Sequence, residues 1–292
     1  MDQLLQHLLN GLLLGATYSL LGIGLTLVFG LMSVVNFAHG EFYTLGAYAA
    51  FAALTVASVH FFLAIPLAIV VGAAAGAVCE RGLLRPLRGQ SIDTVMLVMI
   101  GLWIAMQNAE LLGWGGVAKS VATPFPTQPL VLGPVSVAPL RVFVFVVSAA
   151  LILGAHLLLA RTKLGRAMRA VAENHETAAL LGVNVNRVVL ITFVIGSGIA
   201  GIAGVLDGLK NSSVSPFMGL GAAVKGLIVM LLGGLGNVPG AMIAGLLLGM
   251  IEILSAAYIG TTERDFFSFL ILILILLYRP TGLFGTRTAE QK

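Results

Sequence analysis

Five ionisable side chains stand inside apolar stretches of this sequence, where a charge is costly and is therefore a candidate for function. They are Glu41, Glu110, Asp207, Lys225 and Glu252. Side chains of this kind can bind a solute, carry a proton or pair with one another within a helical bundle. They form no nucleophile–base pair and no metal-ligand spacing, so we expect neither an enzyme nor a metal site. They also form no chain of carboxylates that would indicate a proton relay, which counts against an ion-driven carrier.

Four of these groups also have a structural explanation. Glu110 and Asp207 lie near the ends of apolar stretches, and we expect their side chains to reach the membrane interface. Lys225 and Glu252 can form an ion pair inside the bundle.

Polar and glycine-rich residues interrupt the apolar pattern at two places that resemble each other. Val35–Glu41 contains Asn36, His39 and Glu41 and precedes a small-residue helix, and Gly233–Gly240 does the same before another. Broken segments in corresponding halves of a chain indicate an internal pseudo-symmetric repeat and a substrate path. The alternative is local: Asn36 caps a helix, and Glu41 adds a favourable charge to its first turn.

The composition identifies the elements that must position these groups. Of 292 residues, 59% are apolar and 10% are charged, whereas soluble domains have about 25% charged residues. This excludes a soluble domain, a disordered chain and a nucleic-acid-binding module. We predict an all-α, polytopic membrane bundle of eight to nine transmembrane helices in one domain over residues 1–292. The nine apolar stretches are Leu8–Gly30, Glu41–Val59, Phe61–Val78, Val95–Leu112, Val142–Ala160, Val188–Leu209, Ala222–Leu235, Ala241–Ile259 and Phe266–Leu277.

Small residues at helical spacing predict close helix packing within the bundle, with dimerisation as the alternative. The sets are Gly196, Ala200, Gly204 and Gly208; Gly72 and Gly76; Gly11 and Gly15; and Gly245 and Gly249.

Basic residues indicate the orientation, because cytoplasmic loops are rich in Lys and Arg. Three clusters are placed in the cytoplasm, which puts the N-terminus outside and the C-terminus inside. They are Arg81, Arg85 and Arg88; Arg161, Lys163, Arg166, Arg169 and Arg187; and Arg279, Arg287 and Lys292. This count requires the short stretch Ala222–Leu235 to cross the membrane, although its length also fits a re-entrant segment.

The longest polar segment on the cytoplasmic side is Arg161–Arg187. Good helix formers predict one helix over Arg166–Leu181, which Gly182 ends. Its weakly apolar face would dock into a groove on a partner; the alternative is a solvated interfacial helix. That face consists of Met168, Ala172, Ala178 and Leu181.

Several motifs resemble the permeases of branched-chain amino acid ABC transporters of the LivH type. They occur in the family's order over nearly the whole chain: Asn36-Phe-Ala-His-Gly-Glu41, Ala172-Glu-Asn to Leu-Gly-Val-Asn184, Ser215-Pro-Phe-Met-Gly219, Gly233-Gly-Leu-Gly-Asn-Val-Pro-Gly-Ala241 and Arg279-Pro to Gly-Leu-Phe-Gly285.

This resemblance implies a machine with several subunits. The expected partners are a second, related permease, two cytoplasmic ATPase subunits that bind ATP and Mg²⁺, and a periplasmic substrate-binding protein. No cofactor is expected in this chain. The residues implied to form the coupling helix in an ATPase groove are Glu173, Asn174, Glu176, Ala178, Leu180, Leu181 and Gly182. The hypothesis of alternating access in the bacterial inner membrane assigns the solute path to Asn36, His39, Glu41, Gly234, Gly236 and Asn237.

Three alternatives stay open at this point. The same family could carry urea, short amides or other amino acids, because the motifs do not separate these solutes. An ion-coupled carrier acting alone would transport without ATP. A channel would need a selectivity filter, which the sequence does not display.

Overall fold

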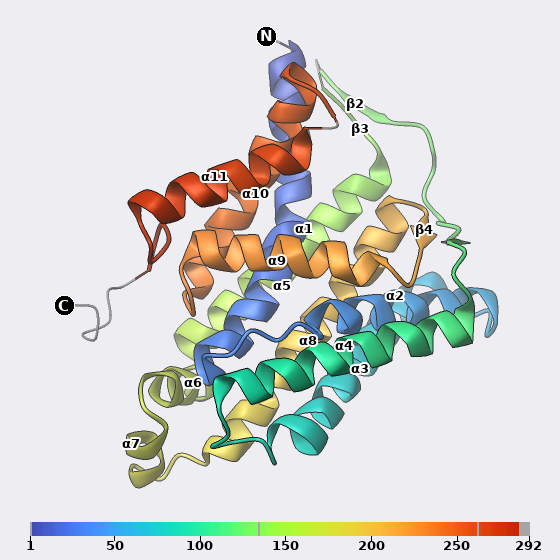
Figure 1. Ribbon diagram of the computed structural model, residues 1–292. Coiled ribbons are helices and arrows are strands. Elements are labelled where there is room, and N and C mark those ends of the chain that lie inside the picture. Colours follow the sequence, from blue (N-terminus) through green and yellow to red (C-terminus); the bar gives the residue numbers. More distant parts are fainter. Residues whose placement is uncertain (1, 134, 262, 286–292) are drawn as a thin grey trace. The chain divides into compact units, whose positions relative to one another are not determined.

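Helices make up most of the computed structural model, which describes residues 2–133, 135–261 and 263–285 (Figure 1). The sequence expectation of an all-α membrane bundle is confirmed. The α-helices in the described residues are α1 (Asp2–Met32), α2 (His39–Thr55), α3 (Phe61–Cys79), α4 (Ile92–Trp114), α5 (Pro139–Arg161), α6 (Lys163–Glu173), α7 (His175–Leu180), α8 (Val185–Lys210), α9 (Met218–Gly233), α10 (Val238–Tyr258) and α11 (Arg264–Tyr278).

Each of the nine apolar stretches lies mostly within one helix, but Glu41–Val59 extends four residues beyond the end of α2, and the helices differ in length. Six helices in the described chain are long and apolar enough to cross a membrane: α1, α3 with the π-helical turn η1 (Glu80–Leu84), α4, α5, α8 and α10. Helices α2, α9 and α11 have 17, 16 and 15 residues, or about 23 to 26 Å at 1.5 Å per residue, against a hydrocarbon core of about 30 Å. The chain is thus a multi-pass membrane protein, and a count of eight to nine crossings stays a prediction.

The chain folds into two compact units, each built from separate stretches of sequence. Unit 1 contains the described residues of Met1–Thr26, Phe125–Ile152 and Lys225–Lys292. Unit 2 contains Leu27–Pro124 and Leu153–Val224.

Glycines allow the helices of unit 2 to pack with their backbones in contact. A Cβ atom on Gly72 of α3 would lie 2.6 Å from the Ser197 carbonyl oxygen of α8, and one on Gly201 would lie 2.8 Å from the Ala68 oxygen. On the same face of α8, Gly204 abuts the backbone of Tyr43 in α2. The prediction of close packing within the bundle is confirmed for Gly72 and Gly204, because no larger side chain fits there. Gly201 packs in the same way but was not among the predicted residues.

Unit 1 uses the same device between α1 and α10. A Cβ on Gly15 would lie 2.6 Å from the Leu246 Cα, and one on Gly245 would lie 2.6 Å from the Ser19 Cα. Gly11 approaches Met250 in the same way.

Three short strands lie in the segment between α4 and α5, and a fourth lies between α8 and α9 in the described chain. In unit 2, β1 (Lys119–Ser120) pairs antiparallel with β4 (Ser213–Val214). In unit 1, β2 (Leu130–Leu132) pairs antiparallel with β3 (Val135–Val137).

Candidate functional site

The predicted coupling segment forms two helices, which corrects the expectation of one continuous helix over Arg166–Leu181. Helix α6 ends at Glu173, and α7 begins at His175. Between them Asn174 is extended, with φ −159° and ψ 118°. Its side-chain oxygen accepts a hydrogen bond from the Thr177 N–H at 2.8 Å. Asn174 is therefore the N-cap of a new helix, a role for which asparagine is well suited.

The end of α7 agrees with the sequence. Gly182 has φ +84°, a left-handed conformation that glycine adopts at little cost. Its N–H donates to the Ala179 oxygen at 3.0 Å, and the Val183 N–H donates to the Ala178 oxygen at 3.0 Å. These two bonds form a Schellman motif, so Gly182 ends the helix as predicted.

The side chains of this segment divide into a buried set and an exposed set. Met168 and Ala178 are 1% and 2% exposed, whereas Leu180 and Leu181 are 88% and 77% exposed. The predicted apolar face is thus wrong in its membership, because Leu181 and Ala172 do not share the buried side with Met168 and Ala178. The other polar members of the coupling set, Glu173, Asn174 and Glu176, are also exposed. Two adjacent leucines on a polar surface form a candidate contact for a partner.

Asn36, His39 and Glu41 are all buried at the start of α2 in unit 2. They are 4%, 1% and 0% exposed. The Asn36 oxygen accepts from the Ala38 N–H at 3.1 Å, but the N-cap of α2 is Ala38. Asn36 therefore forms a turn before the helix and does not cap it. Glu41 does lie in the first turn, as predicted.

These buried groups are short of hydrogen-bond partners. Asn36 Nδ2, both His39 ring nitrogens and both Glu41 carboxyl oxygens have no hydrogen-bond partner in the described chain. Buried polar atoms without partners are uncommon and need an explanation, such as water, an ion or a solute. This burial is compatible with a role in a solute path, and the role itself stays a prediction.

Glu110 of α4 belongs with this cluster, which corrects the expectation that it reaches the interface. Its side chain is buried, with 5% exposure for the residue, and its two carboxyl oxygens, like those of Glu41, have no hydrogen-bond partner in the described chain. The sequence placed it near the end of an apolar stretch but did not indicate that this face of α4 packs against α2. Asp207 differs: it forms an ion pair with Lys210 at 2.7 Å and is about one-fifth exposed.

The second broken segment, in unit 1, is a contact for the C-terminal motif. Gly234 and Gly236 have φ +100° and +76°, and Asn237 is the N-cap of α10, accepting from the Gly240 N–H at 2.9 Å. The Asn237 amide also donates to the Phe284 oxygen at 2.7 Å. A Cβ on Gly234 would lie 2.6 Å from the Gly285 nitrogen. The sequence identified both motifs but not their contact.

Lys225 and Glu252 pair in unit 1, as predicted, within a larger network. Glu252 is fully buried and accepts from Lys225, Arg264 at 2.6 Å, the Tyr18 hydroxyl at 2.8 Å and the Ser268 hydroxyl at 2.7 Å. Lys225 also bonds Asp265 at 2.7 Å. The network links α1, α9, α10 and α11. A charge paired in this way has a structural role that accounts for its burial.

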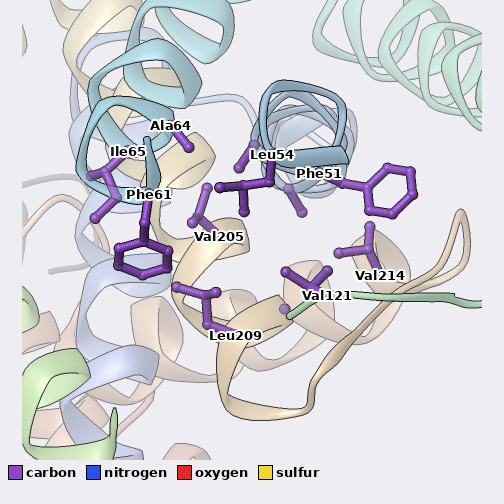
Figure 2. A pocket seen from close by; sticks show the side chains of 12 residues that line it. Phe51, Leu54, Phe61, Ala64, Ile65, Val121, Val205, Leu209 and Val214 are labelled. Carbon is purple, nitrogen blue, oxygen red and sulfur yellow. The ribbon is translucent and has the colours of Figure 1, made fainter. Parts of the chain in front are cut away.

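An apolar pocket in unit 2 lies under the β1–β4 ribbon (Figure 2). Phe51 and Leu54 of α2, Phe61 of α3 and Leu209 of α8 line it, together with Val214 of β4 and Val121, which follows β1. Its interior volume is about 10 Å³, roughly the space for one water molecule. With apolar side chains around it and so little room, it is a packing gap and not a solute site.

A polytopic helical bundle with buried polar groups is typical of a membrane transport subunit. The comparisons agree. Residues 7–278 match the family described as "Branched-chain amino acid transport system / permease component".

Curated relatives cover nearly the whole chain. The chain is 39% identical to the high-affinity branched-chain amino acid transport system permease protein BraD of Pseudomonas aeruginosa, over 98% of this chain and 97% of the relative. It is 38% identical to the LivH permease protein of Escherichia coli K12 over the same shares. The ribose import permease protein RbsC of E. coli K12 is 26% identical over 85% of this chain and 77% of the relative. The chain therefore belongs to the permease family of branched-chain amino acid transport systems.

Proposed function

We propose that this chain is a transmembrane permease subunit of an ATP-driven importer that carries leucine, isoleucine and valine across the bacterial inner membrane. The observation that carries the proposal is similarity over nearly the full length to permeases named for branched-chain amino acid transport. Identity to the ribose permease is lower, 26% against 38–39%, which favours amino acids over a sugar as the solute.

The exposed end of α7 supports its assignment as the contact site for an ATPase subunit. Leu180 and Leu181 project from the surface between the N-cap at Asn174 and the Schellman motif at Gly182, so both ends of the helix are fixed. An apolar pair on a short, well-defined helix is suited to a groove on another protein. In the proposal, α7 sits in the ATPase groove, and the ATPase subunits bind ATP and Mg²⁺.

The remaining assignments follow the same proposal. A second permease completes the membrane part, and a periplasmic protein delivers the solute. Two segments are proposed for the solute path, each in its own unit: Asn36, His39 and Glu41 in unit 2, and Gly234, Gly236 and Asn237 in unit 1. In the proposal the C-terminus is cytoplasmic and the N-terminus periplasmic, which the distribution of basic residues supports; two of these residues, Arg287 and Lys292, lie outside the described residues.

Competition for uptake tests the solute. Membrane vesicles containing the chain with its partner permease, ATPases and binding protein receive labelled leucine, ATP and an excess of valine, urea or a short amide. The proposal predicts that valine alone blocks uptake. If urea or the amide blocks uptake, the assignment as an importer stands, but the assigned solute is wrong.

Substitution of the exposed leucines tests the ATPase contact. Leu180→Asn with Leu181→Asn should release the ATPases from the purified complex without changing the unfolding of the permease, because neither side chain packs in its own chain. Val117→Asn is the matched control, since Val117 is 75% exposed in the segment after α4 and outside the proposed contact. Full retention of the ATPases by the double variant would contradict the assignment.

A further inference from the structure

The His175 side chain joins α7 to the end of α1. Its Nε2 atom lies 2.7 Å from the Leu31 carbonyl oxygen. Helix α1 ends at Met32, so this carbonyl is among the last four of the helix, which have no partner within it. The imidazole N–H supplies the missing donor, and both residues belong to unit 2.

Leu31 is the next-to-last residue of α1, and the connector from α1 to α2, residues 33–38, begins after Met32. Ser33 in this connector has φ +52°, an uncommon conformation for a residue with a side chain. Its N–H donates to the Phe29 oxygen at 2.7 Å. The connector contains Asn36 and leads to His39, so a displacement at Leu31 acts on the backbone that holds the buried polar cluster.

The other hydrogen bonds that define α7 are local to its own segment. The Asn174 cap and the bonds at Gly182 involve residues 174–183 only. Within the described residues, His175 is the α7 residue whose side chain forms a hydrogen bond to an element distant in the sequence, the end of α1.

We propose that His175 is a positioning residue that transmits movement of α7 to the connector between α1 and α2. The inference rests on the proposed function, in which the ATPases contact α7. When ATP binding moves α7, the bond to Leu31 carries the displacement to the connector, and the polar groups at the start of α2 move with it. Without the His175 N–H, movement of α7 is not transmitted to the connector.

Two substitutions separate the donor from the ring. His175→Phe keeps a planar ring and removes the N–H, whereas His175→Gln removes the ring and keeps an N–H donor on an amide group. Both are measured in the complete transporter, as leucine imported per ATP hydrolysed. Since one hydrogen bond corresponds to a factor of about two to ten, His175→Phe should lower this ratio by about two- to tenfold. His175→Gln should restore most of it, and ATPase retention should be normal in both.

His60→Phe is the matched control, because it makes the same change at an exposed histidine of unit 2 that lies outside α7 and whose side chain caps no helix; its ratio should equal that of the original chain. An unchanged ratio for His175→Phe, or an equal loss in both His175 variants, would overturn the inference.

The leucine double variant distinguishes the inference from the function on which it rests. If Leu180→Asn with Leu181→Asn keeps the ATPases bound, α7 is not the contact and both proposals fail. If it releases them while His175→Phe has no effect, only the role of His175 is overturned.

Discussion

Removal of the Glu252 carboxylate should be among the most damaging single changes in unit 1. Glu252→Ala leaves Lys225, 15% exposed at its side chain, and Arg264, 35% exposed, without their shared buried anion. Removing one partner of a buried ion pair costs about 3–5 kcal/mol, because the remaining charge is uncompensated. At 1.36 kcal/mol per factor of ten, the unfolding constant should rise by about two to nearly four orders of magnitude.

A cycle of variants isolates the pair from the rest of the network. Reversible unfolding in mixed detergent micelles gives the free energy of unfolding for Lys225→Met, Glu252→Gln and the double variant. Since the two residues touch, the double variant should be less destabilised than the sum of the singles by about 1–3 kcal/mol.

An exposed ion pair is the control for this cycle. Lys210→Ala breaks the partly exposed pair with Asp207 and should cost about 0–1 kcal/mol. A cost for Glu252→Ala no larger than that of Lys210→Ala, or strict additivity in the cycle, would refute the reasoning.

Three further predictions concern backbone positions. Gly72→Ala should destabilise the protein by about 1–3 kcal/mol in the same unfolding assay, because the new Cβ meets the Ser197 oxygen of α8 at 2.6 Å. Gly101→Ala is the control: open space surrounds Gly101, so this change should be neutral or stabilising by up to about 1 kcal/mol. Equal costs for the two variants would contradict the packing argument. Gly182→Ala should lower ATPase retention several-fold, because alanine disfavours the left-handed conformation with φ +84° that ends α7. Gly182→Asn should retain the ATPases almost normally, because asparagine tolerates this conformation. Equal retention for both variants would show that backbone strain at this position has no effect. Asn174→Ala should cost about 0.5–2 kcal/mol through loss of the N-cap and increase amide hydrogen exchange in α7, and unchanged exchange would show that the cap is not needed.

Hydropathy predicted the helical elements well because the membrane requires long apolar runs with satisfied backbones. Each of the nine stretches lies mostly within one helix, and Val95–Leu112, for example, lies within α4 (Ile92–Trp114). The number of crossings could not be read in the same way. Helices α2, α9 and α11 are apolar yet short, and length alone does not decide how a helix of 15–17 residues lies in a bilayer.

Contacts between distant segments were beyond the sequence pattern. The burial of Glu110 depends on which face of α4 meets α2, and the pairing of Lys119 with Val214 joins residues far apart in the chain. The contact of Asn237 with Phe284 is of the same kind. Periodicity describes one element at a time, so it does not contain this information.

The break at Asn174 could have been predicted. Asparagine favours the N-cap, and the Thr177 N–H three residues later is the donor that such a cap accepts. The propensities of the surrounding residues, averaged over Arg166–Leu181, concealed this local signal. For the same reason the sequence suggested one apolar face, whereas the two helices bury Met168 and Ala178 and expose Leu180 and Leu181.

The most direct test of the central claim is the energy source for leucine uptake. Proteoliposomes containing the chain, its partner permease, ATPases and binding protein are compared with and without ATP, and with an ion gradient in place of ATP. The account predicts uptake only with ATP, binding protein and all subunits present. Uptake by this chain alone on an ion gradient would contradict it.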